Sequence, residues 1–155
     1  MIITDIEALH LRLPNVEEIA DGTQDVLIIR IHTDAGLVGI GEVSSQSYVC
    51  KAIFEAPRSA ERRHGLAYLL RGRDPMDEGL WQHLYHHTNR YGRRGAAIHA
   101  ISGADIALWD LRGKALGKPV YELLGGPHRT SVRAYASYLF GSTPRETGEL
   151  ARQAV

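Results

Sequence analysis

The sequence predicts an α+β fold in which an antiparallel three-stranded meander is followed by a helical bundle. Apolar and β-branched residues alternate or run together in residues 2–13, 25–33 and 37–43, and turn-forming residues separate these segments. From about residue 48 the apolar residues instead recur every three or four positions, which is the helical period. Strands that precede helices along the chain are typical of an α+β domain.

The two connections between the predicted strands differ in length. Residues 34–36 read Asp-Ala-Gly and predict a tight turn. Residues 14–24 contain Pro, Asn, Asp and Gly and predict a loop of eleven residues. A connection of that length is long for a hairpin, and such loops often carry function.

Two short helices are predicted after the strands. Val49, Ile53 and Ala56 lie one helical turn apart, and they predict a first helix that ends before Pro57. Residues 61–70 predict a second helix. Its inward-facing residues are expected to be three leucines, Leu66, Leu69 and Leu70.

Two longer helices complete the predicted bundle. Asp74 as N-cap and Pro75 at the first helical position predict the start of the third. Residues 96–116 predict the fourth, whose small residues allow another backbone to approach closely. Its apolar stripe consists of Ala97, Ile101, Ala104, Leu108, Leu111 and Ala115. Beyond it, Pro119 can begin a short helix, and the glycines at 125–126 can end that helix.

The last part of the chain changes pattern again. Residues 131–140 predict a strand, and Thr143 followed by Pro144 predicts the cap of a last helix over residues 145–155. A strand followed by a helix is half of a βαβ unit. Such a strand needs a parallel neighbour to pair with, and the chain offers none.

Composition and charge exclude several classes of protein. Lys and Arg together number 18, as do Asp and Glu, whereas nucleic-acid-binding domains are usually basic. The single cysteine, Cys50, excludes an internal disulfide framework and fits a reducing cytoplasm. The first residues lack the features of a signal peptide, and no apolar run is long enough for a membrane span. We expect a cytoplasmic protein without nucleic-acid or membrane partners.

The block from Gly95 to Gly126 carries the most specific pattern in the chain. It resembles the signature stretch of the mandelate racemase/muconate lactonizing branch of the enolase superfamily, and the GIGEV segment at residues 39–43 is also similar. Ala104 departs mildly, since a larger aliphatic residue is common there. The resemblance is carried by Ala100, Ser102, Gly103, Asp105, Ala107, Leu108, Asp110, Leu111, Gly113, Lys114, Pro119, Val120, Leu123, Leu124 and Gly125.

The resemblance implies two domains. Residues 1–126 would form the N-terminal capping domain, and residues 127–155 would be the start of a truncated TIM-type (β/α) barrel. In the family, later barrel strands carry the base and the acidic ligands of Mg²⁺, so catalytic and metal-binding residues are expected beyond Val155. A whole barrel takes about 250 residues. The 155-residue chain alone is therefore expected to be inactive, and the full-length protein is expected to be a homo-oligomer.

The resemblance also implies the chemistry. The proton α to a carboxylate is too weakly acidic for a side chain to remove unaided, and a divalent ion stabilises the enediolate that forms. Reprotonation then gives racemisation, loss of a β-hydroxyl gives dehydration, and loss of a β-carboxylate ester gives lactone opening. The implied substrate is a small carboxylate.

Two cap loops close over the barrel mouth in this family, and by position they would be residues 14–24 and 44–48. Both are rich in small polar residues, which suit a polyhydroxylated substrate better than an apolar one. In the predicted barrel strand, Ser137 and Tyr138 lie near the end that faces an active site, and alternation lets only one of them point inward. The candidate substrate-binding residues are Asp21, Thr23, Gln24, Ser45, Gln46, Tyr48, Ser137 and Tyr138.

We therefore expect an acid-sugar dehydratase acting on a sugar acid. Within the same family, a racemase, an epimerase or a cycloisomerase stays possible, because the base motif that separates these reactions is not in the chain. From another class, a non-catalytic binding or assembly module could reuse the cap fold.

Two further groups of residues have both a chemical and a structural interpretation. His83 and His87 are four apart on a predicted helix, a spacing that can bind zinc, but surface or interface histidines are the default. Asp105 and Asp110 are five apart, so they do not share a helix face. We interpret them as residues that anchor loops or pair with nearby basic residues rather than as an acid and a base.

Overall fold

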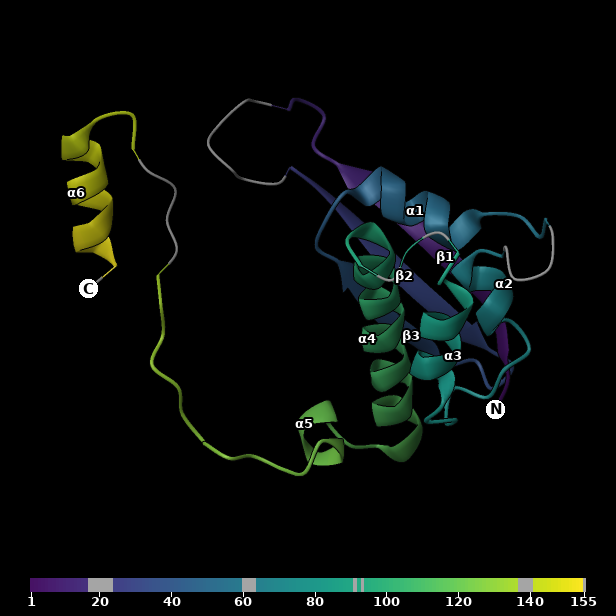
Figure 1. Ribbon diagram of the computed structural model, residues 1–155. Helices are drawn as coiled ribbons and strands as arrows, with labels where there is room; N and C mark the ends of the chain where they lie inside the picture. The colour runs from purple at the N-terminus through teal and green to yellow at the C-terminus, as the bar shows by residue number, and fades with distance from the viewer. Residues whose placement is uncertain (17–23, 60–63, 91, 93, 137–140, 155) are drawn as a thin grey trace.

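The structure is a computed structural model that describes residues 1–16, 24–59, 64–90, 92, 94–136 and 141–154. Its three strands, β1 (Ile3–Arg12), β2 (Asp25–Thr33) and β3 (Val38–Val43), form one antiparallel sheet in the order β1–β2–β3. Figure 1 shows helices α1 to α4 gathered against one side of this sheet. The predicted α+β meander followed by a helical bundle is therefore confirmed.

The helices follow the strands in chain order. They are α1 (Ser47–Glu55), α2 (Leu66–Leu70), α3 (Leu80–His87), α4 (Ala96–Leu116), α5 (Val120–Leu123) and α6 (Pro144–Gln153). The bounds of α4 and β2 agree with those predicted from the sequence. Thr143 caps α6 as expected, because its hydroxyl accepts a hydrogen bond from the backbone N–H of Glu146 at 3.2 Å.

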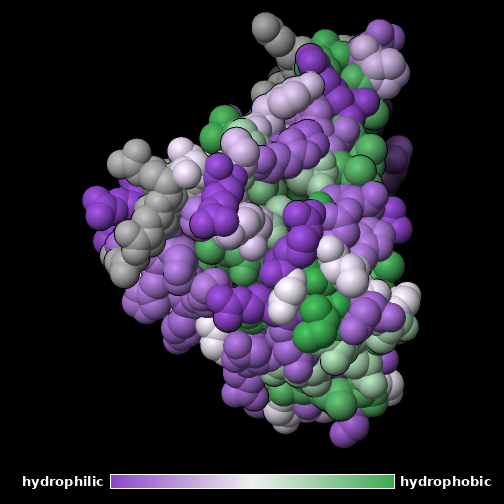
Figure 2. All heavy atoms as spheres, turned by 90° about the vertical axis from the view of Figure 1, so that its right-hand side faces the viewer, coloured by the Kyte–Doolittle hydropathy of each residue, from purple (hydrophilic) through white to green (hydrophobic). Residues whose placement is uncertain are grey.

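The hydrophobic core lies between the sheet and the helices. Leu27, Ile29 and Ile31 are fully buried on the face of β2 that the helices cover, while Arg30 and His32 alternate onto the other face. Figure 2 shows a side of the molecule on which hydrophilic side chains predominate and hydrophobic ones are interspersed. The period-2 pattern of the sequence thus selects which face of the sheet is covered.

Helix α4 packs unusually close to β3 because glycines face each other across the contact. A Cβ atom on Gly39 would meet the carbonyl oxygen of Ala107, and one on Gly41 would meet that of Gly103. A Cβ on Gly103 would in turn meet the side chain of Val43. The predicted close approach is confirmed. Of the predicted stripe on α4, Ala97, Ile101, Ala104, Leu108 and Leu111 are buried, whereas Ala115 is exposed.

Two predictions about the first helices need correction. Helix α1 forms, but it buries Ser47, Cys50 and Phe54, and the predicted stripe of Val49, Ile53 and Ala56 lies toward solvent or only partly buried. Helix α2 is shorter than expected and begins only after Gly65. Gly65 is extended, and its N–H donates to the carbonyl of Ala56 at 3.0 Å, which holds this segment against the end of α1. The three inward-facing leucines of α2 are confirmed.

The third helix also begins later than predicted, at Leu80 rather than after Asp74. The Asp74 carboxylate accepts the N–H of Met76 at 3.0 Å, and that of Asp77 accepts the N–H of Gly79 at 2.8 Å. Two successive turns closed by Asp side chains therefore replace the expected first helical turn.

The predicted strand over residues 131–140 is not formed in its described part. Residues 131–136 are exposed and have no regular structure, and residues 137–140 lie outside the described residues. A parallel strand gains its hydrogen bonds only from a neighbour, which explains the result. In Figure 1, α6 lies apart from the sheet and its helices. No helix among the described residues combines the length and the apolar character needed to cross a membrane.

Candidate functional site

The antiparallel pairing places the starting points of the two predicted substrate loops at the same end of the strands. We call this end of the sheet the loop edge. Arg12 pairs with Asp25 at the end of β1, and Leu27 pairs with Val43 at the end of β3. Both strands therefore end at the edge where β2 begins. The loop that follows β1 and the loop that follows β3 therefore leave the sheet at the same end, on either side of β2.

The first loop is described only at its base. The N–H of Leu13 donates to the carbonyl of Gln24 at 2.9 Å, which extends the β1–β2 ladder by one bond. Gln24 is half-buried and lines a shallow cavity with Leu11, Arg12 and Val26. The candidate residues Asp21 and Thr23 lie outside the described residues, as do Ser137 and Tyr138.

The second loop leads directly into α1 and is held by backbone contacts. The thiol of Cys50 donates to the carbonyl of Ser45 at 3.3 Å, and the N–H of Cys50 donates to the carbonyl of Gln46 at 3.0 Å. Burial raises the pKa of the Cys50 thiol, so the thiol remains protonated and can donate. Gln46 has a left-handed backbone with φ 40°, which is unfavourable outside glycine and fixes the direction in which the chain enters α1.

Three candidate residues of the second loop lie at the surface of this edge. Tyr48 is 67% exposed and Gln46 is also exposed, while Ser45 is half-buried. The side chain of Gln46 makes no capping hydrogen bond to α1. These side chains therefore present hydroxyl and amide groups outward, where they can bind a polar ligand.

A side-chain cluster that sequence reasoning missed joins the two loops. His10 on β1 donates from Nε2 to the Asp25 carboxylate at 2.8 Å, and its ring lies 4.2 Å from the ring of Tyr48, centroid to centroid. The hydroxyl of Ser47 also hydrogen-bonds to Asp25. The cluster of His10, Asp25, Ser47 and Tyr48 fixes the base of the first loop against the start of α1.

The electrostatics of this cluster give a pH-dependent stability. The hydrogen bond from His10, followed by that from Ser47, holds the pKa of Asp25 below its ordinary value. A carboxyl group with a lowered pKa stabilises the fold above its unfolded pKa, and this stability is lost as the pH falls through the folded pKa.

We expect Asp25→Asn to lower the free energy of unfolding at pH 7, because it removes the charge that His10 contacts. The loss should shrink as the pH falls from about 4 through the lowered pKa of the folded state, because the wild-type carboxyl then becomes protonated in both states. Urea unfolding of the wild type and the variant at pH 7 and at pH 3 measures this change in the free energy of unfolding. Glu122→Gln, an exposed position on α5 with the same charge change, is the control. An equal loss for Asp25→Asn at both pH values would contradict the prediction.

The remaining acidic and histidine candidates have structural partners. Asp110 accepts the backbone N–H of Ile40 at 2.8 Å and pairs with Lys114 at 2.6 Å, so it ties α4 to β3. Burial raises the pKa of Asp105, and the charge of Arg112 opposes this effect. Asp105 and Asp110 are thus not arranged as an acid and a base, and their contacts agree with the interpretation that they anchor loops or pair with basic residues.

The described residues do not supply a metal site. No group of three or more His, Cys, Asp or Glu side chains among them is arranged to hold an ion. His83 and His87 do lie together, with ring centroids 4.1 Å apart, but Arg73 contacts His83, and its positive charge opposes a metal cation there. The described residues therefore assign no metal chemistry to the loop edge.

The sequence of this chain is similar to those of known proteins. The sequence profile of the mandelate racemase / muconate lactonizing enzyme N-terminal domain matches residues 8–125. The chain is 37% identical over 135 residues to an arabinonate dehydratase of Saccharolobus solfataricus, covering 87% of the chain and 35% of that protein. It is 38% identical over 115 residues to a D-galactarolactone cycloisomerase of Agrobacterium fabrum, covering 74% and 28%.

A solved structure shows the same arrangement. The mandelate racemase/muconate lactonizing protein from Paracoccus denitrificans, complexed with magnesium, is 32% identical with a TM-score of 0.67, covering 83% of this chain and 31% of that one. The chain thus spans about a third of the length of these relatives. The sheet, the bundle and the matched sequence together show that the chain belongs to the mandelate racemase/muconate lactonizing enzyme family of the enolase superfamily.

Proposed function

We propose that this chain is the substrate-covering part of a longer Mg²⁺-dependent enzyme that removes the proton α to a carboxylate and dehydrates a sugar acid. The observation that carries the proposal is that the strands leading into two polar loops end at the same end of the sheet, in a chain of this family. The similarity to an arabinonate dehydratase supports the substrate class.

Mg²⁺ would stabilise the charge that develops on the substrate carboxylate when the α-proton leaves. The described residues do not fit an Mg²⁺ site, so we derive no step of the reaction from them. Their proposed role is to bind and orient. Ser45, Gln46 and Tyr48 would hydrogen-bond to substrate hydroxyls, and Gln24 would contribute from the first loop together with Asp21, Thr23 and either Ser137 or Tyr138.

The proposed domain division places the cap in residues 1–126 and the start of a barrel domain in residues 127–155. The end of the profile match at residue 125 supports this division. The family resemblance supports a homo-oligomer for the full-length protein, and the single cysteine supports a cytoplasmic location.

A cycloisomerase is the second candidate, since one relative of 38% identity is a D-galactarolactone cycloisomerase. Both reactions begin with removal of an α-proton, and they differ in the bond that then breaks or forms. Polar loops suit the hydroxyl groups of either substrate, so the reaction itself has to be measured.

The test uses the protein extended to the length of its relatives, with Mg²⁺ and a panel of sugar acids, sugar lactones and dipeptides. We expect dehydration of at least one sugar acid. Tyr48→Phe should raise KM for that substrate by about tenfold, because one hydroxyl contact to the ligand is lost. Tyr121→Phe, at another exposed tyrosine on α5, is the control and should leave KM unchanged.

Three outcomes decide between the candidates. Turnover of a lactone but of no sugar acid favours the cycloisomerase, and turnover of a dipeptide alone refutes both. The 155-residue chain with Mg²⁺ and the same panel should show no turnover, and activity above background would overturn the cap assignment.

A further inference from the structure

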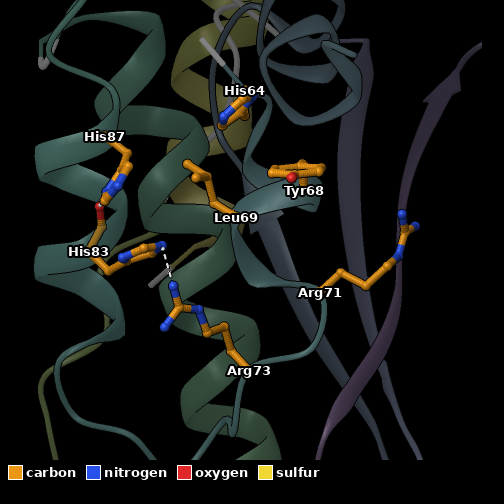
Figure 3. A pocket seen from close by; sticks show the side chains of 7 residues that line it. All are labelled: His64, Tyr68, Leu69, Arg71, Arg73, His83 and His87. Atoms are coloured by element: carbon orange, nitrogen blue, oxygen red, sulfur yellow. Dashed lines mark hydrogen bonds between the residues drawn. The ribbon is translucent and has the colours of Figure 1, made fainter. Parts of the chain in front are cut away.

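A second cavity lies away from the loop edge, and basic and aromatic side chains line it. Its volume is about 590 Å³, and its lining comes from α2, α3 and the segments that flank α2. The lining residues are His64, Tyr68, Leu69, Arg71, Arg73, His83 and His87, which Figure 3 shows around the opening. No acidic side chain is found among the described residues that line it. None of these residues belongs to the proposed substrate edge.

The two arginines of the lining differ in their partners. Figure 3 shows Arg71 extending away from the cavity toward β1. There its guanidinium pairs with the Asp5 carboxylate at 2.5 Å and donates from Nε to the carbonyl of Thr4 at 3.2 Å. The charge of Arg71 is therefore compensated by Asp5.

Arg73 instead reaches across the cavity to a histidine. Its guanidinium lies 3.5 Å from Nε2 of His83, and since a guanidinium can only donate, Nε2 of His83 accepts. None of the ion pairs found among the described residues gives Arg73 a carboxylate partner. Within the described part of the chain, Arg73 therefore adds a positive charge that no carboxylate pairs with directly.

The histidines of α3 complete the basic lining. Nδ1 of His87 donates to the backbone carbonyl of His83 at 2.8 Å, which orients the ring and leaves Nε2 for a ligand. Burial lowers the pKa of His83, and the positive potential of His87 and Arg73 adds to this effect, with Asp77 and a hydrogen bond to the Leu69 backbone opposing it. The positive groups in this cavity thus repel one another, and an anion placed among them would relieve that repulsion.

We propose that this cavity is a binding site for a phosphoryl group, in which Arg73 provides the charged contact, Nε2 of His87 provides an imidazole contact, and His83 orients Arg73. A guanidinium matches two oxygens of a phosphate. Nε2 of His87 can accept a hydrogen bond from a protonated phosphate oxygen, or donate one when the ring is protonated. The hydroxyl-bearing ring of Tyr68 and the side chain of Leu69 bound the space beside them. The phosphoryl group can come from free phosphate or from a small phosphomonoester.

The test measures binding to the 155-residue chain by NMR of the histidine rings, at constant ionic strength. Titration with inorganic phosphate should shift the ring resonances of His83 and His87 saturably, with a dissociation constant of about 1 mM or tighter. Exposed His128 serves as the internal reference and should not follow the same curve. Bound phosphate should also raise the pKa of His83, because it cancels the charge of Arg73.

Variants separate a specific site from general attraction of anions. Arg73→Gln should weaken phosphate binding by about tenfold or more, since it removes a charged hydrogen-bond donor. Arg133→Gln changes the net charge equally at an exposed position in the segment without regular structure, and it should bind as the wild type does. Urea unfolding of both variants checks that each is folded, and the wild-type titration tests the proposal even where a variant fails to fold.

A parallel titration with glycerol 3-phosphate distinguishes the two sources. Tighter binding than that of inorganic phosphate assigns a phosphomonoester, and weaker binding assigns the free ion. Either result supports the site. The proposal is overturned when phosphate produces no saturable shift of His83 and His87, or when chloride at matched ionic strength produces the same shifts.

Discussion

Replacing Gly41 with alanine is expected to destabilise the fold by about 3 kcal/mol, because the contact between β3 and α4 has no room for a methyl group. A Cβ atom at this position would meet the carbonyl oxygen of Gly103, and it would lie 2.9 Å from the backbone nitrogen of Ala107. Both atoms belong to the helix backbone, which cannot move aside as a flexible side chain can. The whole of α4 would have to shift away from the sheet.

The measurement is the free energy of unfolding in urea, followed by circular dichroism. Gly148→Ala is the matched control, because a Cβ there meets nothing within 4 Å and the position lies in helix α6. Alanine is favoured over glycine inside a helix, so the control should be neutral or slightly stabilising. A Gly41→Ala variant as stable as the control would show that α4 and β3 do not approach as closely as described.

The second large effect is expected at Arg112, the one charged side chain that is buried among the described residues. Its guanidinium donates to the carbonyls of Pro75 and Asp77, each at 2.9 Å, and it lies 4.9 Å from the centre of the Trp109 ring. Arg112→Ala leaves both carbonyls without this donor and removes the contact with the ring. We expect a loss of about 2–4 kcal/mol in the free energy of unfolding.

The effect at Arg112 should depend on pH in a defined direction. The charge of Arg112 opposes the rise in the pKa of Asp105 that burial causes, so the variant leaves ionised Asp105 with less compensation. A carboxyl group with a raised folded pKa stabilises the fold only when protonated, and this stability is lost as the pH rises through the folded pKa. The loss caused by Arg112→Ala should therefore be larger at pH 7 than at pH 4.

Arg145→Ala provides the control for loss of an arginine. The Arg145 side chain is 88% exposed and forms a surface pair with Glu149 on α6, so its removal should change stability by less than about 0.5 kcal/mol. Equal effects at Arg112 and Arg145, or a loss at Arg112 that is the same at both pH values, would argue against the described role of Arg112.

Local sequence patterns predicted the elements whose stability is local. The stripe of small and apolar residues predicted the bounds of α4, and the β-branched run of residues 25–33 predicted β2. The predicted start of α3 was wrong because an Asp side chain can either cap a helix or close a turn. Asp74 closes a turn here. The predicted buried face of α1 was wrong because Cys50 and Phe54 form a second apolar stripe, and only contact with the rest of the fold decides between the two.

The contacts inside the candidate site could not be predicted from the sequence, and its role in binding stays a prediction. The meander topology was enough to place the described ends of residues 14–24, and residues 44–48, at the same end of the strands. The contact between His10 and Asp25 depends on strand register, which places Arg12 opposite Asp25 and so brings His10 diagonally within reach. The position of Tyr48 over His10 depends further on how α1 packs, and no pattern within a single sequence encodes that distance.

The glycine contact between β3 and α4 has a consequence for how the family diversifies. The residues that seat the helix, Gly39, Gly41 and Gly103, are separate from those that form the outward surface of the two loops. Loop residues can therefore be exchanged during evolution without disturbing the packing that keeps the domain folded. The two relatives of this chain, an arabinonate dehydratase and a D-galactarolactone cycloisomerase, differ in the reaction that their names state, as such a separation would allow.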